Sequence, residues 1–268
     1  MRRIHFIEIH DQAWVPESAR DAVTDALQFV FNLGRLYAPV VPRLHKALVR
    51  AGTNHILDLC SGGGGPWLWM QREFESNENF PVSVCLTDKY PNRSAFERVR
   101  ELSGGKIDYV AEPVDVTNIP PERRGFRTMF TSFHHFRPQE ARAILQNAVD
   151  NEQGIAVFEI PHRRALTILE TLFVPPVALL TVPFVRPFRW SRLLWTYLIP
   201  FVPLVMLFDG IVSCLRAYSH AELRELTEGI CAPNYEWEVG EALTGPLRLP
   251  VTYLIGCPAS GRSMLRPY

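Results

Sequence analysis

Three aspartates in the first half of the chain lie at the ends of strand-like runs. Asp58 belongs to "HILDL", Asp88 ends "VSVCLTD", and Asp115 lies in "PVDVTNIP". The segment "CSGGGG" begins two residues after Asp58. Glycine loses more backbone freedom on folding than any other residue, so four in succession indicate that something must approach bare backbone there. We therefore expect a ligand site at this turn, the alternative being a flexible turn of no consequence.

The same aspartates suggest what the ligand is. The carboxylate of Asp88 can accept hydrogen bonds from both hydroxyls of a ribose, and that of Asp115 from the exocyclic amine of adenine, with Val116 beside the ring. Asp58 would lie near an ammonium group, because a carboxylate here would repel a pyrophosphate. The pattern favours an adenosyl ligand that carries an amino-acid tail.

Chemistry beside that ligand is expected from "SFHHF" and from Glu159. An unperturbed histidine titrates near neutrality, so His134 or His135 can serve as a base or orient an acceptor, and we prefer His135. Glu159, near the end of a later strand, is the third catalytic candidate. The alternatives are that one histidine only packs against its phenylalanine neighbours and that Glu159 pairs with Arg163 or Arg164.

Several polar and aromatic residues in or near apolar segments are candidates for substrate binding. They are Tyr37, Trp195, Asp209, Arg216 and Tyr218. A carboxylate in apolar surroundings needs a partner, so an Asp209–Arg216 pair that braces its segment is the favoured alternative for those two residues. Tyr37 belongs either to a cap over the ligand or to ordinary packing.

The elements that must position these residues follow from hydrophobic periodicity. A helix is predicted over 18–33, with Ser18 as its cap and Gly34 at its end, and another over 42–50 that stops at Gly52. Strand and helix patterns then alternate over 53–160, which predicts a parallel sheet with helices on both faces. A helix in "SHAELRELTEG" is followed by the strands "YEWEVGEAL" and "VTYLIGCP", joined by "TGPLRLP", which must be antiparallel.

The predicted fold class is α/β, with a doubly wound, mostly parallel seven-stranded sheet that ends in an antiparallel hairpin. We divide the chain into an N-terminal helical cap (1–52), a Rossmann-like core (53–160), a hydrophobic helical insertion or lid (161–216), and a C-terminal helix and strand pair that complete the core (217–268).

With these motifs the sequence resembles the class I S-adenosylmethionine-dependent methyltransferases. The resemblance rests on "LDLCSGGGG", "LTDKYPN", "VDVTNIP", "FTSFHHF" and the terminal strand pair, over about 53–160 and 217–258. The family's acid-x-Gly-x-Gly-x-Gly motif places the acid at Asp58 and later glycines at Gly62 and Gly64, with Cys60 where the first glycine is usual. It implies S-adenosylmethionine as cofactor, with S-adenosylhomocysteine as product. The predicted cofactor-binding residues are Asp58, Cys60, Ser61, Gly62, Gly64, Asp88, Lys89, Asp115, Val116 and Ser132.

The expected function is methyl transfer to a small, hydrophobic acceptor in a desolvated pocket covered by the insertion. The glycine segment also fits G-x-G-x-x-G, so an NAD(P)-dependent oxidoreductase remains an alternative. A non-catalytic module that binds S-adenosylmethionine or a nucleotide is another. The oxidoreductase reading explains neither Asp58 nor the closing hairpin.

The insertion at 161–216 has apolar runs of about 14 and 16 residues, shorter than the roughly 20 that span a bilayer. Prolines 175, 176, 183, 187, 200 and 203 are expected to break it. We therefore expect no spanning helix. Peripheral membrane contact with a lipid or isoprenoid acceptor is a minor variant, and a homodimer interface another.

Composition excludes some partners. Lys plus Arg and Asp plus Glu both number 28, so no basic field favours nucleic acid. The five cysteines form no C-x-x-C pair and are expected to be reduced, as in a cytoplasmic protein, and no metal site is predicted. The first residues lack the apolar run of a signal peptide.

Overall fold

The computed structural model describes residues 1–230, 232, 234–245 and 248–258. The chain forms two compact units. The sheet unit consists of Leu36–Ile160 and His220–Tyr268, and the helical unit of Met1–Arg35 and Pro161–Ser219. This division differs from the predicted one, in which 1–52 formed one cap. Residues 36–52 lie in the sheet unit because the helix that they contain packs on a strand of the sheet.

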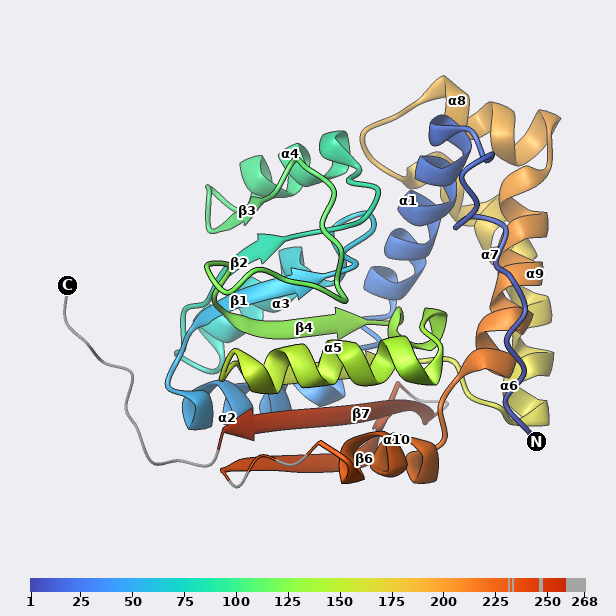
Figure 1. Ribbon diagram of the computed structural model, residues 1–268. Coiled ribbons are helices and arrows are strands. Elements are labelled where there is room, and N and C mark those ends of the chain that lie inside the picture. Colours follow the sequence, from blue (N-terminus) through green and yellow to red (C-terminus); the bar gives the residue numbers. More distant parts are fainter. Residues whose placement is uncertain (231, 233, 246–247, 259–268) are drawn as a thin grey trace. The chain divides into compact units, whose positions relative to one another are not determined.

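The sheet unit holds a seven-stranded sheet of order β3-β2-β1-β4-β5-β7-β6. Its strands are β1 His55–Leu59, β2 Ser83–Leu86, β3 Ile107–Tyr109, β4 Phe126–Phe130, β5 Ile155–Glu159, β6 Tyr235–Thr244 and β7 Leu249–Pro258. The first five strands pair in parallel, whereas β7 is antiparallel to both β5 and β6. Figure 1 shows the reversed direction of the β7 arrow relative to β4. The predicted fold class is confirmed.

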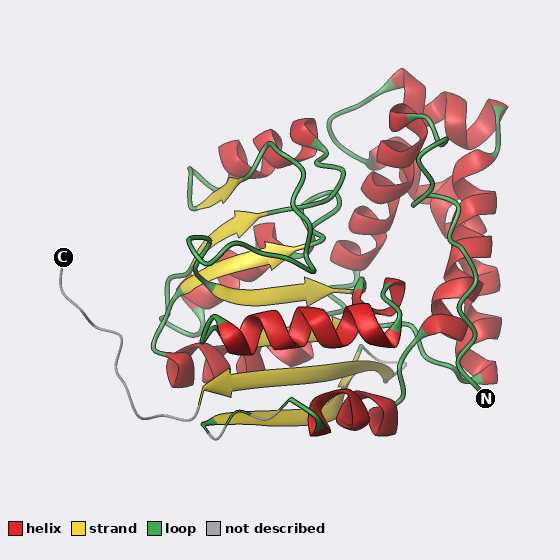
Figure 2. Ribbon diagram, viewed as in Figure 1, coloured by secondary structure: helices red, strands yellow, loops and turns green. Residues whose placement is uncertain are grey.

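Helices cover both faces of this sheet, and Figure 2 shows α5 in front of the strands. They are α2 Val41–Ala51, α3 Trp67–Ser76, α4 Arg93–Leu102, α5 Pro138–Asp150 and α10 His220–Glu228, with 3₁₀ turns at Ala38–Val40 and Phe133–His135. Local signals set their ends. The Asn92 side chain accepts a hydrogen bond from Ala95 N (3.1 Å) at the start of α4, and Gly52 ends α2 in the left-handed conformation.

The helical unit is built from α1 Glu17–Leu33, α6 Ala165–Glu170, α7 Val174–Thr181, α8 Trp190–Leu193 and α9 Phe201–Arg216. Two 3₁₀ turns, Thr171–Phe173 and Val182–Phe184, and a π-helical turn, Leu194–Leu198, link these helices. Its core is made by α1, α7, α9 and their flanking turns. The core residues are Ala22, Val23, Ala26, Ala178, Val182, Val202, Val205 and Met206.

Two expectations about the helical unit are wrong. Ser18 does not cap α1, which begins at Glu17 after Pro16. The prolines do not break the first apolar run, because Pro175, Pro176 and Pro183 occupy the first positions of successive short helices, where no backbone N–H is required. Ala165–Phe184 is therefore helical over 20 residues and passes a length-and-composition test for a membrane span. Trp190–Leu198 and Phe201–Arg216 pass only as a pair bent by 72°.

Cys60, Cys85, Cys214 and Cys257 form no disulfide with one another, as expected. Cys231 lies outside the described residues, as do residues 246 and 247 of the predicted "TGPLRLP" link between the last two strands.

Candidate functional site

The turn after β1 has an unusual backbone. The φ angle is positive at Cys60 (56°), Gly62 (54°), Gly64 (106°) and Gly65 (56°). Glycine adopts such angles at no steric cost, whereas the angle at Cys60 is uncommon for a residue with a Cβ. A Cβ built on Gly62 would meet no atom within 4 Å. The glycine segment thus leaves open space beside its backbone, at the carboxyl edge where open α/β sheets bind ligands.

Asp58 stabilises this turn through hydrogen bonds. Its buried carboxylate accepts hydrogen bonds from Ser61 Oγ and Thr128 Oγ1, each at 2.6 Å. Burial raises the pKa of Asp58 to about 6, and the two hydroxyl bonds oppose that rise. Backbone bonds from Ser61 N to Thr87 O (2.9 Å) and from Thr87 N to Asp58 O (2.9 Å) join the turn to the end of β2. These contacts give Asp58 and Ser61 a structural role in shaping the site, and their predicted contact with a ligand stays a prediction.

Asp88 reaches the same turn from the end of β2. Its Oδ2 accepts from Gly62 N (2.8 Å) and its Oδ1 from Tyr90 N (2.8 Å). The residue is half-buried. A carboxylate oxygen accepts more than one hydrogen bond, so both oxygens can still accept from ribose hydroxyls. Lys89, next in the chain, is exposed, with its ammonium nitrogen 5.8 Å from the centre of the Tyr90 ring.

Asp115 is exposed after β3. Its Oδ1 accepts from the N–H (2.9 Å) and hydroxyl (2.7 Å) of Thr117, and these bonds hold the pKa of Asp115 below its usual value. The side chains of Val116 and Ile119 beside it are buried. The predicted contact of Asp115 and Val116 with adenine stays a prediction.

Glu159 organises the turn after β4. Its buried Oε1 accepts from the backbone N–H groups of Ser132 (2.9 Å) and Phe133 (2.7 Å), and its Oε2 contacts His134 Nδ1 (2.5 Å). These are the contacts that the structure gives Glu159, in place of the arginine pair considered from the sequence. Ser132 Oγ is buried and has no hydrogen-bond partner among the described residues. His134 is buried, whereas His135 is half-buried and its ring centre lies 4.4 Å from that of His134.

Sequence reasoning missed Thr131. This β-branched residue has a φ of 45°, which is an outlier for its type. Its Oγ1 bonds to Tyr37 OH (2.7 Å) and accepts from Ile160 N (3.2 Å). Tyr37 is itself buried, and its ring packs edge-on against Phe130 (4.9 Å between centroids). Backbone strain cannot be read from a threonine in a sequence, so only the folded chain marks this position.

The other predicted substrate-binding residues lie in the helical unit and have contacts there. Trp195 Nε1 donates to Ser18 Oγ (3.1 Å), and the Trp195 ring packs against Phe201. The guanidinium of Arg3 lies 4.0 Å from the centre of the buried Tyr218 ring. Contact of these residues with a substrate stays a prediction.

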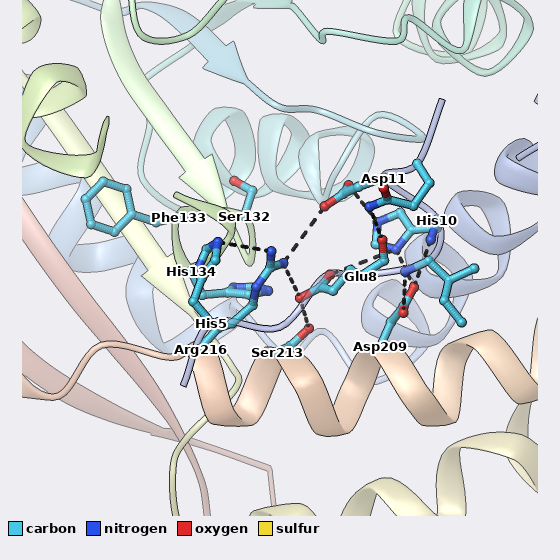
Figure 3. A network of polar contacts seen from close by, with 12 residues as sticks. His5, Glu8, His10, Asp11, Ser132, Phe133, His134, Asp209, Ser213 and Arg216 are labelled. Carbon is cyan, nitrogen blue, oxygen red and sulfur yellow. Dashed lines mark hydrogen bonds and ion pairs between the residues drawn. The ribbon is translucent and has the colours of Figure 1, made fainter. Parts of the chain in front are cut away.

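The predicted Asp209–Arg216 pair is wrong (Figure 3). Asp209 accepts from the backbone N–H groups of Ile9 (2.7 Å) and His10 (3.1 Å) and contacts His10 Nδ1 (2.7 Å), while Arg216 pairs with Glu8 (2.9 Å). Seven residues separate the two on α9, which is roughly 10 Å along the axis. Ligand atoms of Glu8, His10 and Asp209 lie within 4.8 Å of one another, but their bonds account for them as a brace between the N-terminal segment and α9.

Comparisons with known proteins bear on the fold. No protein-family model matches the sequence, and a search of curated proteins finds no match. Among solved structures, the citrinin polyketide synthase CMeT domain is similar with a TM-score of 0.53 at 12% identity, over 88% of this chain and 56% of that one. The O-methyltransferase NcsB1 from neocarzinostatin biosynthesis, in complex with S-adenosyl-L-homocysteine and 1,4-dihydroxy-2-naphthoic acid, gives 0.50 at 15% identity, over 89% of this chain and 58% of that one.

The fold is that of the class I S-adenosylmethionine-dependent methyltransferases. This chain spans little more than half the length of the two similar proteins. In the class I fold the antiparallel β7 lies between β5 and β6, which distinguishes it from a wholly parallel dinucleotide-binding sheet. The chain order reverses between β1 and β4, so the glycine turn, Asp88 and the turn after β4 lie at the switch point of this class I sheet.

Proposed function

We propose that this chain binds S-adenosylmethionine at the carboxyl edge of its sheet and transfers the methyl group to a small, hydrophobic acceptor. The observation that carries the proposal is the turn Cys60–Gly65. Its backbone is largely left-handed, a Cβ at Gly62 would enter open space, and the N–H of Gly62 is held by Asp88. A ligand can thus approach the main chain while its ribose reaches the Asp88 carboxylate.

The residues around the turn fit the parts of this ligand. In this proposal Asp88 accepts hydrogen bonds from the ribose hydroxyls, Asp115 accepts one from the adenine amine, and Val116 packs against the ring. The bonds from Thr117 lower the pKa of Asp115 and so favour its charged form. A pyrophosphate would meet these charges and that of Asp58, so the site supports an adenosyl sulfonium over a nicotinamide dinucleotide.

The bound donor supplies an activated methyl group, and the protein's contribution is alignment and exclusion of water. Glu159 fixes the backbone of the turn after β4 and the ring of His134. We assign His135, the more accessible of the two histidines, to accept the proton of an acceptor that must lose one. The similarity to an O-methyltransferase that binds a naphthoic acid supports an aromatic or otherwise hydrophobic acceptor.

A matched pair of glycine variants tests the cofactor site. Gly62 and Gly52 have similar positive φ angles (54° and 65°), and a Cβ at either meets nothing within 4 Å. Gly62→Ala and Gly52→Ala should therefore lose similar stability, about 1 kcal/mol. Only Gly62→Ala should weaken binding of S-adenosylhomocysteine in calorimetry, by tenfold or more because the methyl group occupies the ligand's approach. Equal affinities for the two variants would contradict the assignment.

Turnover separates the proposed enzyme from a binding module. Formation of S-adenosylhomocysteine with a panel of hydrophobic hydroxyl, amine and thiol acceptors should be detectable for the wild type and reduced in His135→Ala. Tight cofactor binding with no turnover on any acceptor would favour a non-catalytic role. Binding of NADPH in place of S-adenosylmethionine would favour the oxidoreductase.

A further inference from the structure

The helix-and-turn segment Ala165–Phe184 is predominantly apolar, yet little of it is buried. Its mean hydropathy is 1.9 over an 18-residue window, and 17% of that window is buried. One side, at Ala178 and Val182, packs in the core of the helical unit. The opposite side carries large apolar residues that are each more than half exposed, among them Leu166, Leu169, Phe173, Leu180 and Phe184. A helix that is hydrophobic all round is normally buried, in a protein core or in lipid.

The exposed apolar surface continues into the next helices. Trp190 and Leu198 are both 78% exposed, and Leu204 on α9 is 60% exposed although its neighbours Val202 and Val205 lie in the core. We call the exposed large apolar side chains of residues 165–208 the apolar face. Within the described part of the sheet unit, large apolar side chains are exposed only at Val49, Tyr90, Leu102 and Leu243. Such a concentration of exposed large apolar side chains in one segment of the chain is typical of an interaction site.

The charges and aromatic residues in this region match a lipid surface. From 171 to 208 the only charged residues are Arg186, Arg189 and Arg192. Arg192 is buried in an ion pair with Asp25, and Arg189 lies 3.5 Å from the Asp21 carboxylate, so the charge offered to a lipid head group is that of Arg186. Arg186 is exposed between the exposed side chains of Phe184 and Phe188. Arginines beside tryptophan and tyrosine are typical of the head-group region, and basic residues there are attracted to anionic lipids.

The charged residues of α1 argue against a segment that crosses the bilayer. α1 packs on α7 and α9 and carries Glu17, Arg20 and Asp21, none of which is fully buried. Charges held beside a spanning helix would lie at the depth of the hydrocarbon, where they are costly. Contact with lipid is therefore expected on one side only.

We propose that the helical unit lies on a bilayer containing anionic phospholipid, with the apolar face inserted among the lipids and Arg186 at the head groups. The lipids would then bury the apolar side chains that the folded chain leaves exposed. Binding of this kind depends on buried apolar area together with electrostatic attraction.

Flotation of the full chain with vesicles tests the proposal. The protein should float with phosphatidylcholine–phosphatidylserine vesicles at low salt and more weakly with phosphatidylcholine alone. Leu169→Glu combined with Leu180→Glu should lower the partition coefficient by a factor of about 100 or more, since each change removes an exposed leucine that the lipid would bury. Arg186→Glu should lower it about tenfold, and only for the anionic vesicles.

Leu102→Glu serves as the control, because Leu102 is exposed (44%) on α4 of the sheet unit, and it should float like the wild type. Circular dichroism and binding of S-adenosylhomocysteine report whether each variant is folded. The proposal is overturned if the folded wild type does not float at low salt, or if the double variant floats as well as the control. A dimer in light scattering that the double variant dissociates, together with no flotation, would assign the apolar face to a second copy of the chain instead.

Discussion

Glu159 offers the sharpest test of how the site is held, because one side chain satisfies three groups. Its Oε1 is the acceptor for two backbone N–H groups, and its Oε2 contacts the buried His134. In Glu159→Ala both N–H groups lose their partner. A buried donor without a partner costs about 1–3 kcal/mol, so the two N–H groups together cost about 2–6 kcal/mol. The carboxylate–imidazole bond contributes about 1.5–3 kcal/mol more, so we expect a loss of about 4 kcal/mol or more in the free energy of unfolding.

Glu159→Gln is the matched variant, because its amide oxygen can still accept from both N–H groups. Only the contact with His134 is lost, so the expected loss is about 1.5–3 kcal/mol, smaller than for Glu159→Ala. Glu122→Ala, at an exposed position, should change stability by less than about 0.5 kcal/mol. Urea unfolding followed by circular dichroism measures all three, provided that the slope with urea is unchanged. Losses for Ala and Gln that agree within error would refute this account of the turn after β4.

Two further predictions concern stability. Because burial raises the pKa of Asp58 to about 6 from 3.8, the folded state holds a proton that the unfolded state has released between these values, and stability should fall as pH rises through this window. Asp58→Asn should lack this trend. Its unfolding free energy relative to the wild type should therefore rise by up to about 3 kcal/mol between pH 4 and pH 7, as measured by urea titration at both pH values. If that difference falls with pH instead, the hydrogen bonds to Asp58 have a larger effect on its pKa than its burial. Asn92→Ala should lower the free energy of unfolding by about 1 kcal/mol through loss of the cap on α4. Asn118→Ala, at an exposed position, is the control and should leave stability unchanged. Equal shifts of the thermal midpoint for the two variants would contradict the role of the cap.

The sequence by itself determined the architecture of the sheet unit. Alternating strand and helix patterns over 53–160 predict parallel strands, and two strands with a short link predict the closing hairpin, because these patterns depend on residues close together in the chain. The glycine turn and the cap at Asn92 were readable for the same reason, since a positive φ and a capping oxygen are local requirements.

Only the tertiary structure decided which side chains meet. Asp58 bonds to Thr128, 70 residues away, Tyr37 to Thr131, 94 residues away, and Asp209 to His10, 199 residues away. Spacing along a helix or strand places a residue on a face but does not select its partner from a distant segment, which is why the predicted Asp209–Arg216 pair was wrong. The exposure of Ala165–Phe184 also could not be predicted from the sequence, because an apolar run has the same pattern whether the folded chain buries it or leaves it exposed.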